Sequence, residues 1–201
     1  MVLSLGQDSG DFAENSGRIQ AFYIGHRNTL GILSPDAFTQ ANPPVVTTNV
    51  SATLAGITQV GVLGGTVAFT RPDAGNGFVG GPVEGTADDT KLVPLGFFIN
   101  DAVGNAYENT PGIISGKGPY FSGQGTFGLS LWETEDLNGG GALTWEVGDK
   151  VYASRNGLAT NVADANNTYE MQAGAAAPTL LGVVKVAPDA DNSLLVIDLR
   201  V

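Results

Sequence analysis

The chain has 201 residues, of which 29 are glycine and only 14% are charged. This composition argues against long surface helices held by ion pairs and predicts a β-rich fold with abundant turns. Nine basic and twenty acidic residues give a net charge of −11, which disfavours nucleic acid and anionic membranes as partners. The absence of cysteine excludes disulfides, thiolate metal sites and cysteine nucleophiles.

Segments rich in β-branched and aromatic residues alternate with turn signals, and we expect them to form short strands. In chain order they are residues 19–24, 45–54, 59–70, 92–99, 126–134, 150–154, 158–161, 180–187 and 194–201. The best helix start, Ser34-Pro35, is followed by Pro43 and Pro44 within two turns, so little helix is expected. The predicted fold is all-β: a short-stranded β-barrel or sandwich with long glycine-rich loops and very little helix.

Polar or glycine-rich segments divide the chain. Residues 1–18 are predicted to be an N-terminal arm, and the start lacks the basic segment and apolar run of a secretory signal. Residues 100–125 hold much glycine and little periodicity, which predicts a long ordered loop with a binding role. A boundary near residue 90 would separate a β region, 19–90, from a barrel-like region, 91–201. One continuous domain is the alternative.

Two motifs suggest chemistry but are better explained by structure. His26 is the only histidine and follows Gly25, where a turn residue is the simpler interpretation than a catalyst. Residues 123–128 match the pattern G-x-G-x-x-G, but they lead into a strand pattern rather than a helix. A dinucleotide site is therefore not expected.

Acidic residues cluster at two places. Glu133, Glu135 and Asp136 lie beside Trp132, where paired carboxylates would suit glycoside cleavage, although an exposed strand end entering a turn explains them better. Residues 189–193 resemble the opening of a calcium loop but lack its glycine and its closing glutamate, so a hairpin turn is expected. We expect no catalytic residue, no metal and no cofactor.

An aromatic segment, residues 116–121, has two interpretations. It is either a recognition loop, because Tyr and Phe supply contact area at low entropic cost, or a loop folded over its own core.

The C-terminal region contains a recurring strand and turn pattern. Its parts are the Gly-Asp turn and Val-Tyr strand of residues 147–152, the glycine hairpin of 157–160, and the strands of 181–184 and 195–199. This pattern resembles the head decoration, or cement, proteins of tailed bacteriophages. Residues 94–112 are similar to segments of phage virion structural proteins more generally.

The resemblance implies a non-enzymatic virion structural protein on the outer capsid surface, assembled in the bacterial host cytoplasm. It would bind the major capsid protein, bridge its subunits and act as a homo-oligomer, in the family a trimer. A net charge of −11 further suggests a surface that faces away from packaged DNA.

Interface residues are expected in the arm and in the glycine-rich loop because these segments combine irregularity with apolar side chains. The candidates for contact with the partner are Leu3, Leu5, Phe12, Tyr107, Lys117, Tyr120 and Phe121.

Two other classes of function remain open. A phage tail, spike or adhesin module would also be rich in strands and glycine loops. A carbohydrate-binding or glycoside-cleaving module would depend on Trp132, Trp145 and the nearby acids.

Overall fold

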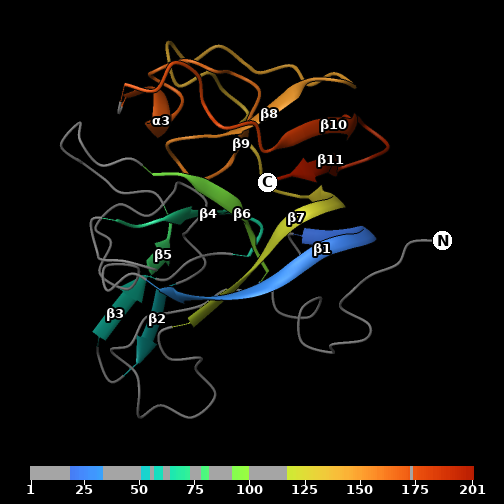
Figure 1. The fold of residues 1–201 in the computed structure, drawn as a ribbon. Coiled ribbons are helices and arrows are strands. Elements are labelled where there is room, and N and C mark those ends of the chain that lie inside the picture. The colour runs from blue at the N-terminus through green and yellow to red at the C-terminus, as the bar shows by residue number, and fades with distance from the viewer. Residues whose placement is uncertain are drawn as a thin grey trace.

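A computed structural model describes residues 19–33, 51–54, 57–60, 64–72, 78–81, 92–99, 117–172 and 174–201 (Figure 1). These ranges contain eleven strands and one four-residue helix, α3 (Tyr169–Gln172), so the predicted all-β fold is confirmed. The strands are β1 (Ile19–Leu33), β2 (Ser51–Leu54), β3 (Ile57–Val60), β4 (Val67–Thr70), β5 (Phe78–Gly80), β6 (Pro94–Phe98), β7 (Lys117–Leu129), β8 (Lys150–Ala153), β9 (Ala159–Thr160), β10 (Gly182–Val186) and β11 (Leu195–Arg200).

Nine of these strands form one curled, barrel-like sheet. Its pairings run from β1 through β5, β4 and β6 to β7, and β7 pairs again with β1, which closes a ring of five strands. All pairs in the ring are antiparallel except β1 with β5. The second edge of β7 also carries β11, from which the sheet continues through β10 and β8 to β9. β2 and β3 pair with each other as a separate hairpin.

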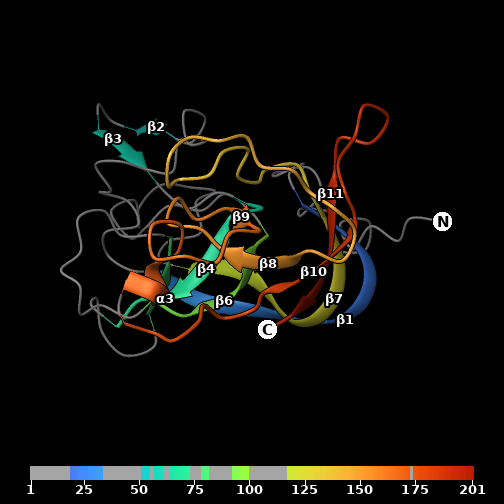
Figure 2. The same cartoon turned by 90° about the horizontal axis from the view of Figure 1, so that it is seen from above.

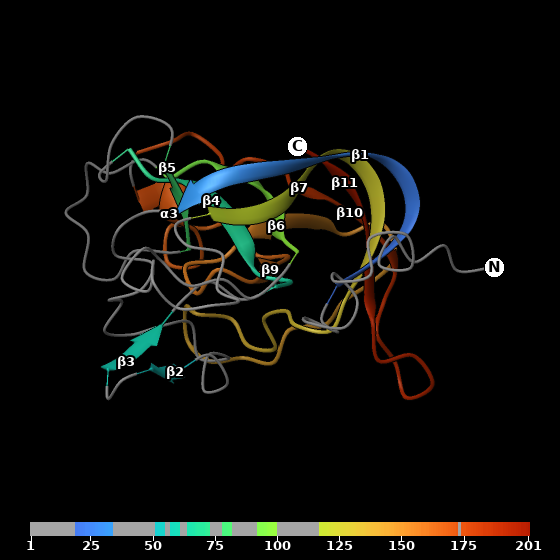
Figure 3. The same ribbon diagram turned by 90° about the horizontal axis from the view of Figure 1, so that it is seen from below.

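Strands β1 and β7 form the spine of the sheet. They curve together along their whole length (Figures 1 and 3), with Ile19 opposite Leu129 and Ile32 opposite Lys117. The register shifts once, between Ala21 and Tyr23, which is the signature of a β-bulge and bends the pair. Strands from both sides of residue 90 therefore lie in one hydrogen-bonded sheet.

Two predictions fail along this spine. The first strand does not end at Gly25 but continues to Leu33, and His26 lies within it, opposite Gly123, rather than in a turn. The predicted loop 100–125 is wrong for residues 117–125, which belong to β7. Glycine lowers intrinsic strand propensity, but pairing with a neighbour on both edges of β7 outweighs it.

The core lies inside the curl of the sheet. β11 alternates buried and half-buried positions, so Leu195, Ile197 and Leu199 point inward. They join Phe97, Phe127 and further apolar side chains in the larger of two clusters. The smaller cluster contains Ala68, Val79 and Phe98.

The C-terminal strands match their predictions closely. β8 and β9 form the hairpin predicted at Asn156-Gly157, and Gly157 has the positive φ of 80° that such a turn requires. β10 and β11 form a second hairpin, whose connecting turn projects from the sheet (Figures 2 and 3). The predicted helix start at Ser34-Pro35 lies outside the described residues.

Candidate functional site

The predicted interface residues fall in different parts of the chain. Leu3, Leu5, Phe12 and Tyr107 lie outside the described residues. Lys117, Tyr120 and Phe121 lie on β7, and therefore on a strand rather than in the predicted loop.

Tyr120 and Phe121 occupy opposite faces of β7. Phe121 is 3% exposed and contacts Phe127, with 4.8 Å between ring centroids, so its side chain belongs to the core. Tyr120 is half-buried against the smaller cluster, and burial raises the pKa of its hydroxyl. Of the two interpretations of this aromatic segment, the packing of Phe121 agrees with the one in which it covers the protein's own core.

The acidic residues beside Trp132 differ in their exposure to solvent. Glu135 is exposed, as predicted, but Glu133 is only 6% exposed, which contradicts its placement at an exposed strand end. The Ser154 hydroxyl donates to Glu133 Oε1 at 2.6 Å, and Trp145 Nε1 donates to the Glu133 carbonyl at 3.3 Å. The first contact joins the segment after β7 to the β8–β9 hairpin, and the second joins it to the chain that precedes β8.

The surroundings of the Glu133 carboxyl group raise its pKa. Burial raises its pKa, the hydrogen bonds from Ser154 and Asn156 lower it in part, and the charge of Glu135 raises it again. Because the pKa is higher in the folded state, protonated Glu133 contributes to folding stability, and this contribution is fully present below the unfolded-state pKa. The contribution is lost as the pH rises through the folded-state pKa.

Glu133→Gln should therefore gain stability relative to wild type as the pH rises from about 4 to about 7, because the amide cannot ionise. Urea unfolding of both proteins across this range measures the difference. Glu135→Gln is the control, since this exposed neighbour should change stability by less than about 0.5 kcal/mol at any of these pH values. A constant difference between Glu133→Gln and wild type would contradict the assignment.

Asn167 joins two loops in the C-terminal half. Its side chain is fully buried, and its Nδ2 donates to Asp136 Oδ1 at 2.8 Å and to Asp164 Oδ1 at 2.9 Å. Its Oδ1 accepts the backbone N–H of Leu137 at 3.0 Å. Burial would raise the pKa of Asp164, but hydrogen bonds from Asn167 and from the backbone N–H of Asn166 outweigh it and lower that pKa. We call these three side chains, of Asp136, Asp164 and Asn167, the asparagine clip.

Glu170 makes a similar connection. Its carboxylate accepts the Thr179 hydroxyl at 2.6 Å and also the Thr179 backbone N–H. Because Glu170 lies in α3 and Thr179 precedes β10, this contact connects the two ends of the segment between them. Like Glu133 and Asn167, it is a buried polar group that is fully used inside the fold.

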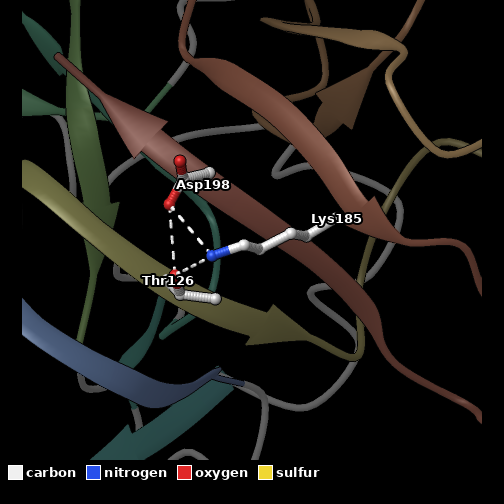
Figure 4. A network of polar contacts seen from close by, with 3 residues as sticks. All are labelled: Thr126, Lys185 and Asp198. Atoms are coloured by element: carbon white, nitrogen blue, oxygen red, sulfur yellow. Dashed lines mark hydrogen bonds and ion pairs between the residues drawn. The ribbon is translucent and has the colours of Figure 1, made fainter.

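A polar network spans three neighbouring strands (Figure 4). The Thr126 hydroxyl on β7 donates to Asp198 Oδ1 on β11 at 3.1 Å and accepts from Lys185 Nζ on β10 at 3.2 Å. Lys185 also lies 3.8 Å from Asp198, with the two side chains 57% and 38% exposed. Both hydrogen-bonding roles of the hydroxyl are occupied, so the network links the three strands through their side chains. Exposed ion pairs of this kind contribute less than about 1 kcal/mol.

Two large apolar side chains are exposed near the same end of the β8–β10 pair. Val147 is 72% exposed and Val186 is 43% exposed. The N–H of Gly148 donates to the Val184 carbonyl at 2.9 Å, which continues the pairing beyond β8 and brings the turn of Val147 beside the end of β10. No pattern in the sequence marks these two residues, because an isolated valine near a turn carries no signal of exposure.

The remaining motifs are structural in the described residues. The segment 123–128 lies inside β7 and leads into no helix. The predicted hairpin turn at 189–193 is confirmed, since Asp189 Oδ1 accepts the backbone N–H groups of Asp191 and Asn192 at 2.8 and 2.7 Å. Among the described residues, no group of three or more His, Asp or Glu side chains is arranged to hold a metal ion. Within those same ranges, no helix has the length and apolar character needed to cross a membrane.

Comparisons with models of protein families, with curated proteins and with solved structures find no match to this chain.

Proposed function

We propose that this protein is a non-enzymatic virion structural protein, which binds the outer surface of an assembled phage capsid and stabilises it by bridging major capsid subunits. One observation carries the proposal. The segments that resemble head decoration proteins fold side by side as β8, β9, β10 and β11 and form one continuous part of the sheet. The two glycine turns that are part of the resemblance also have the expected conformation, with positive φ at Gly148 and Gly157.

The hydrogen bonds of the buried polar side chains support a structural role. Glu133, Asn167 and Glu170 are all buried, and each hydrogen-bonds to a residue from a distant part of the C-terminal region. These contacts fix long connections that would otherwise be loose, and they give a rigid surface suited to repeated contact with a lattice.

The charge and the exposed apolar side chains indicate how the protein would face the capsid. The net charge of −11 suits a protein that faces away from packaged DNA. The exposed Val147 and Val186 offer apolar contact on the described surface, and Leu3, Leu5 and Phe12 offer it in the proposed arm. A trimer would present each contact three times, so that weak individual contacts become strong together on a symmetric capsid.

The test is co-sedimentation of the purified protein with empty, expanded phage capsids. We expect saturable binding with hundreds of copies per particle, a number set by the repetition of the lattice. No pelleting by folded protein would overturn the capsid proposal. Detection of only a few copies in purified virions would then favour the tail, spike or adhesin alternative.

A variant pair locates the contact. Leu3→Asp with Leu5→Asp should weaken pelleting at least about tenfold if the arm binds, since burying an unpaired carboxylate costs more than the ~1.4 kcal/mol that tenfold requires. The control, Ala190→Asp with Ser193→Asp, adds the same charge to the exposed turn between β10 and β11. Equal binding by both variants would remove the arm from the interface without affecting the capsid assignment.

A further inference from the structure

Most backbone nitrogens in the turn from Asp136 to Gly141 donate hydrogen bonds that hold the turn. Asp136 N–H donates to the Gly141 carbonyl at 2.7 Å, and Gly140 N–H donates to the Asp136 carbonyl at 2.8 Å. Inside the turn, Leu137 N–H donates to Asn167 and Asn138 N–H to Asp136 Oδ1, at 3.0 and 2.7 Å. Of the five consecutive N–H groups from 136 to 140, only that of Gly139 has no acceptor among the described residues.

The residue before Gly139 is an asparagine. Asn138 and Gly139 are both exposed, and Gly139 has no Cβ to shield its nitrogen. In such a pair, the glycine nitrogen can attack the side-chain carbonyl carbon of the asparagine. We propose that Asn138 is a site of spontaneous deamidation, at which the folded chain modifies itself without an enzyme or cofactor.

The chemistry balances within the turn. A bond forms between Gly139 N and Asn138 Cγ, the bond from Cγ to the amide nitrogen breaks, and ammonia leaves with the proton from the Gly139 nitrogen. Water then opens the resulting five-membered imide at either carbonyl, and the product is aspartate or isoaspartate. Each event adds one negative charge to a chain of net charge −11.

The sequence has two other Asn-Gly pairs, of which Asn76-Gly77 lies outside the described residues and Asn156-Gly157 provides an internal comparison. Gly157 N–H donates to the Ser154 carbonyl at 3.0 Å, and Asn156 N–H donates to the Ser154 hydroxyl at 3.2 Å. Gly157 is buried, and the Asn156 side chain hydrogen-bonds to Glu133. Attack at Asn156 therefore requires the β8–β9 hairpin to open first, whereas attack at Asn138 does not.

The modification reaches the asparagine clip. Asp136 and Leu137, the two residues before Asn138, hydrogen-bond directly to Asn167. Isoaspartate adds a backbone methylene at position 138 and redirects the chain through the former side chain. We expect this change to disturb the contact between the turn and Asn167.

The experiment is incubation of the full-length protein at mildly alkaline pH, followed by tryptic peptide mass spectrometry with fragmentation that separates aspartate from isoaspartate. Cleavage after Lys150 puts Asn138 and Asn156 on different peptides. We expect Asn138 to be converted at least about tenfold faster than Asn156, a ratio that needs only ~1.4 kcal/mol of difference in opening free energy.

Incubation in concentrated urea is the matched control, because Asn138 and Asn156 should then react at similar rates. Asn138→Gln should abolish conversion at position 138 and leave Asn156 unchanged. Equal rates at the two asparagines in the folded protein would overturn the proposal, and so would an unmodified Asn138 in folded protein that is converted in urea.

Discussion

Replacement of Gly96 by alanine is expected to destabilise the protein by about 3–5 kcal/mol or to prevent folding, which makes it the most damaging single methyl group we can identify. Gly96 lies on β6 with φ of +146°, a conformation that side chains other than glycine rarely adopt. A Cβ at this position would overlap the backbone carbonyl oxygen of Phe121 on β7. Because β6 and β7 are paired here, relief would require the ring of five strands to open.

Thermal unfolding measures the effect, and we expect the midpoint to fall by about 10 °C or more. Gly81→Ala is the matched control, since a Cβ there would meet nothing within 4 Å. It should change stability by less than about 0.5 kcal/mol. Similar midpoints for the two variants would show that β6 and β7 do not approach each other as closely as described.

Asn167→Asp is expected to cost about 3 kcal/mol or more at neutral pH, because it places a third carboxylate between Asp136 and Asp164. The substitution removes the two donated hydrogen bonds and adds like-charge repulsion at a fully buried position. Burial and repulsion both raise the pKa of the introduced carboxyl above its unfolded-state value. The difference from wild type should therefore shrink as the pH is lowered from about 7 toward about 4.

Urea unfolding at several pH values measures this dependence, with the wild type in each buffer as reference. Asn166→Asp makes the same chemical change one residue earlier, on an exposed side chain. We expect it to cost less than about 0.5 kcal/mol and to show little relief on acidification. If Asn167→Asp behaves like Asn166→Asp, the asparagine clip does not hold the two loops together.

Local signals were sufficient where turn chemistry and alternation agree. The hairpin at Asn156-Gly157, the turn at 189–193 and the strands β8, β10 and β11 all follow from glycine, aspartate and period-two patterns in neighbouring residues. The same reasoning failed for β1 and β7, where Gly25 and the glycines of residues 118–125 look like chain breaks. In the structure these glycines lie in paired strands, and strand pairing is a property of two distant segments.

The residues of the candidate site also differ in how far the sequence could predict them. The sequence pattern indicated Glu133 as a candidate acidic residue but predicted that it is exposed. This prediction was wrong because the burial of Glu133 depends on Ser154 and Trp145, which come later in the chain. The sequence offered no signal for Asn167, which matters only because Asp136 and Asp164 meet at its amide.

The sequence by itself determined that the protein is all-β, acidic and free of cysteine, with a pair of hairpins in its C-terminal region. Composition and nearest-neighbour turn chemistry set these properties, and they need no knowledge of distant contacts. Only the tertiary structure decided that β7 carries β1 on one edge and both β6 and β11 on the other, and that Glu133 and Asn167 are buried. The reason is physical: closing the sheet brings together residues far apart in the chain, and their burial and pairing follow from that closure.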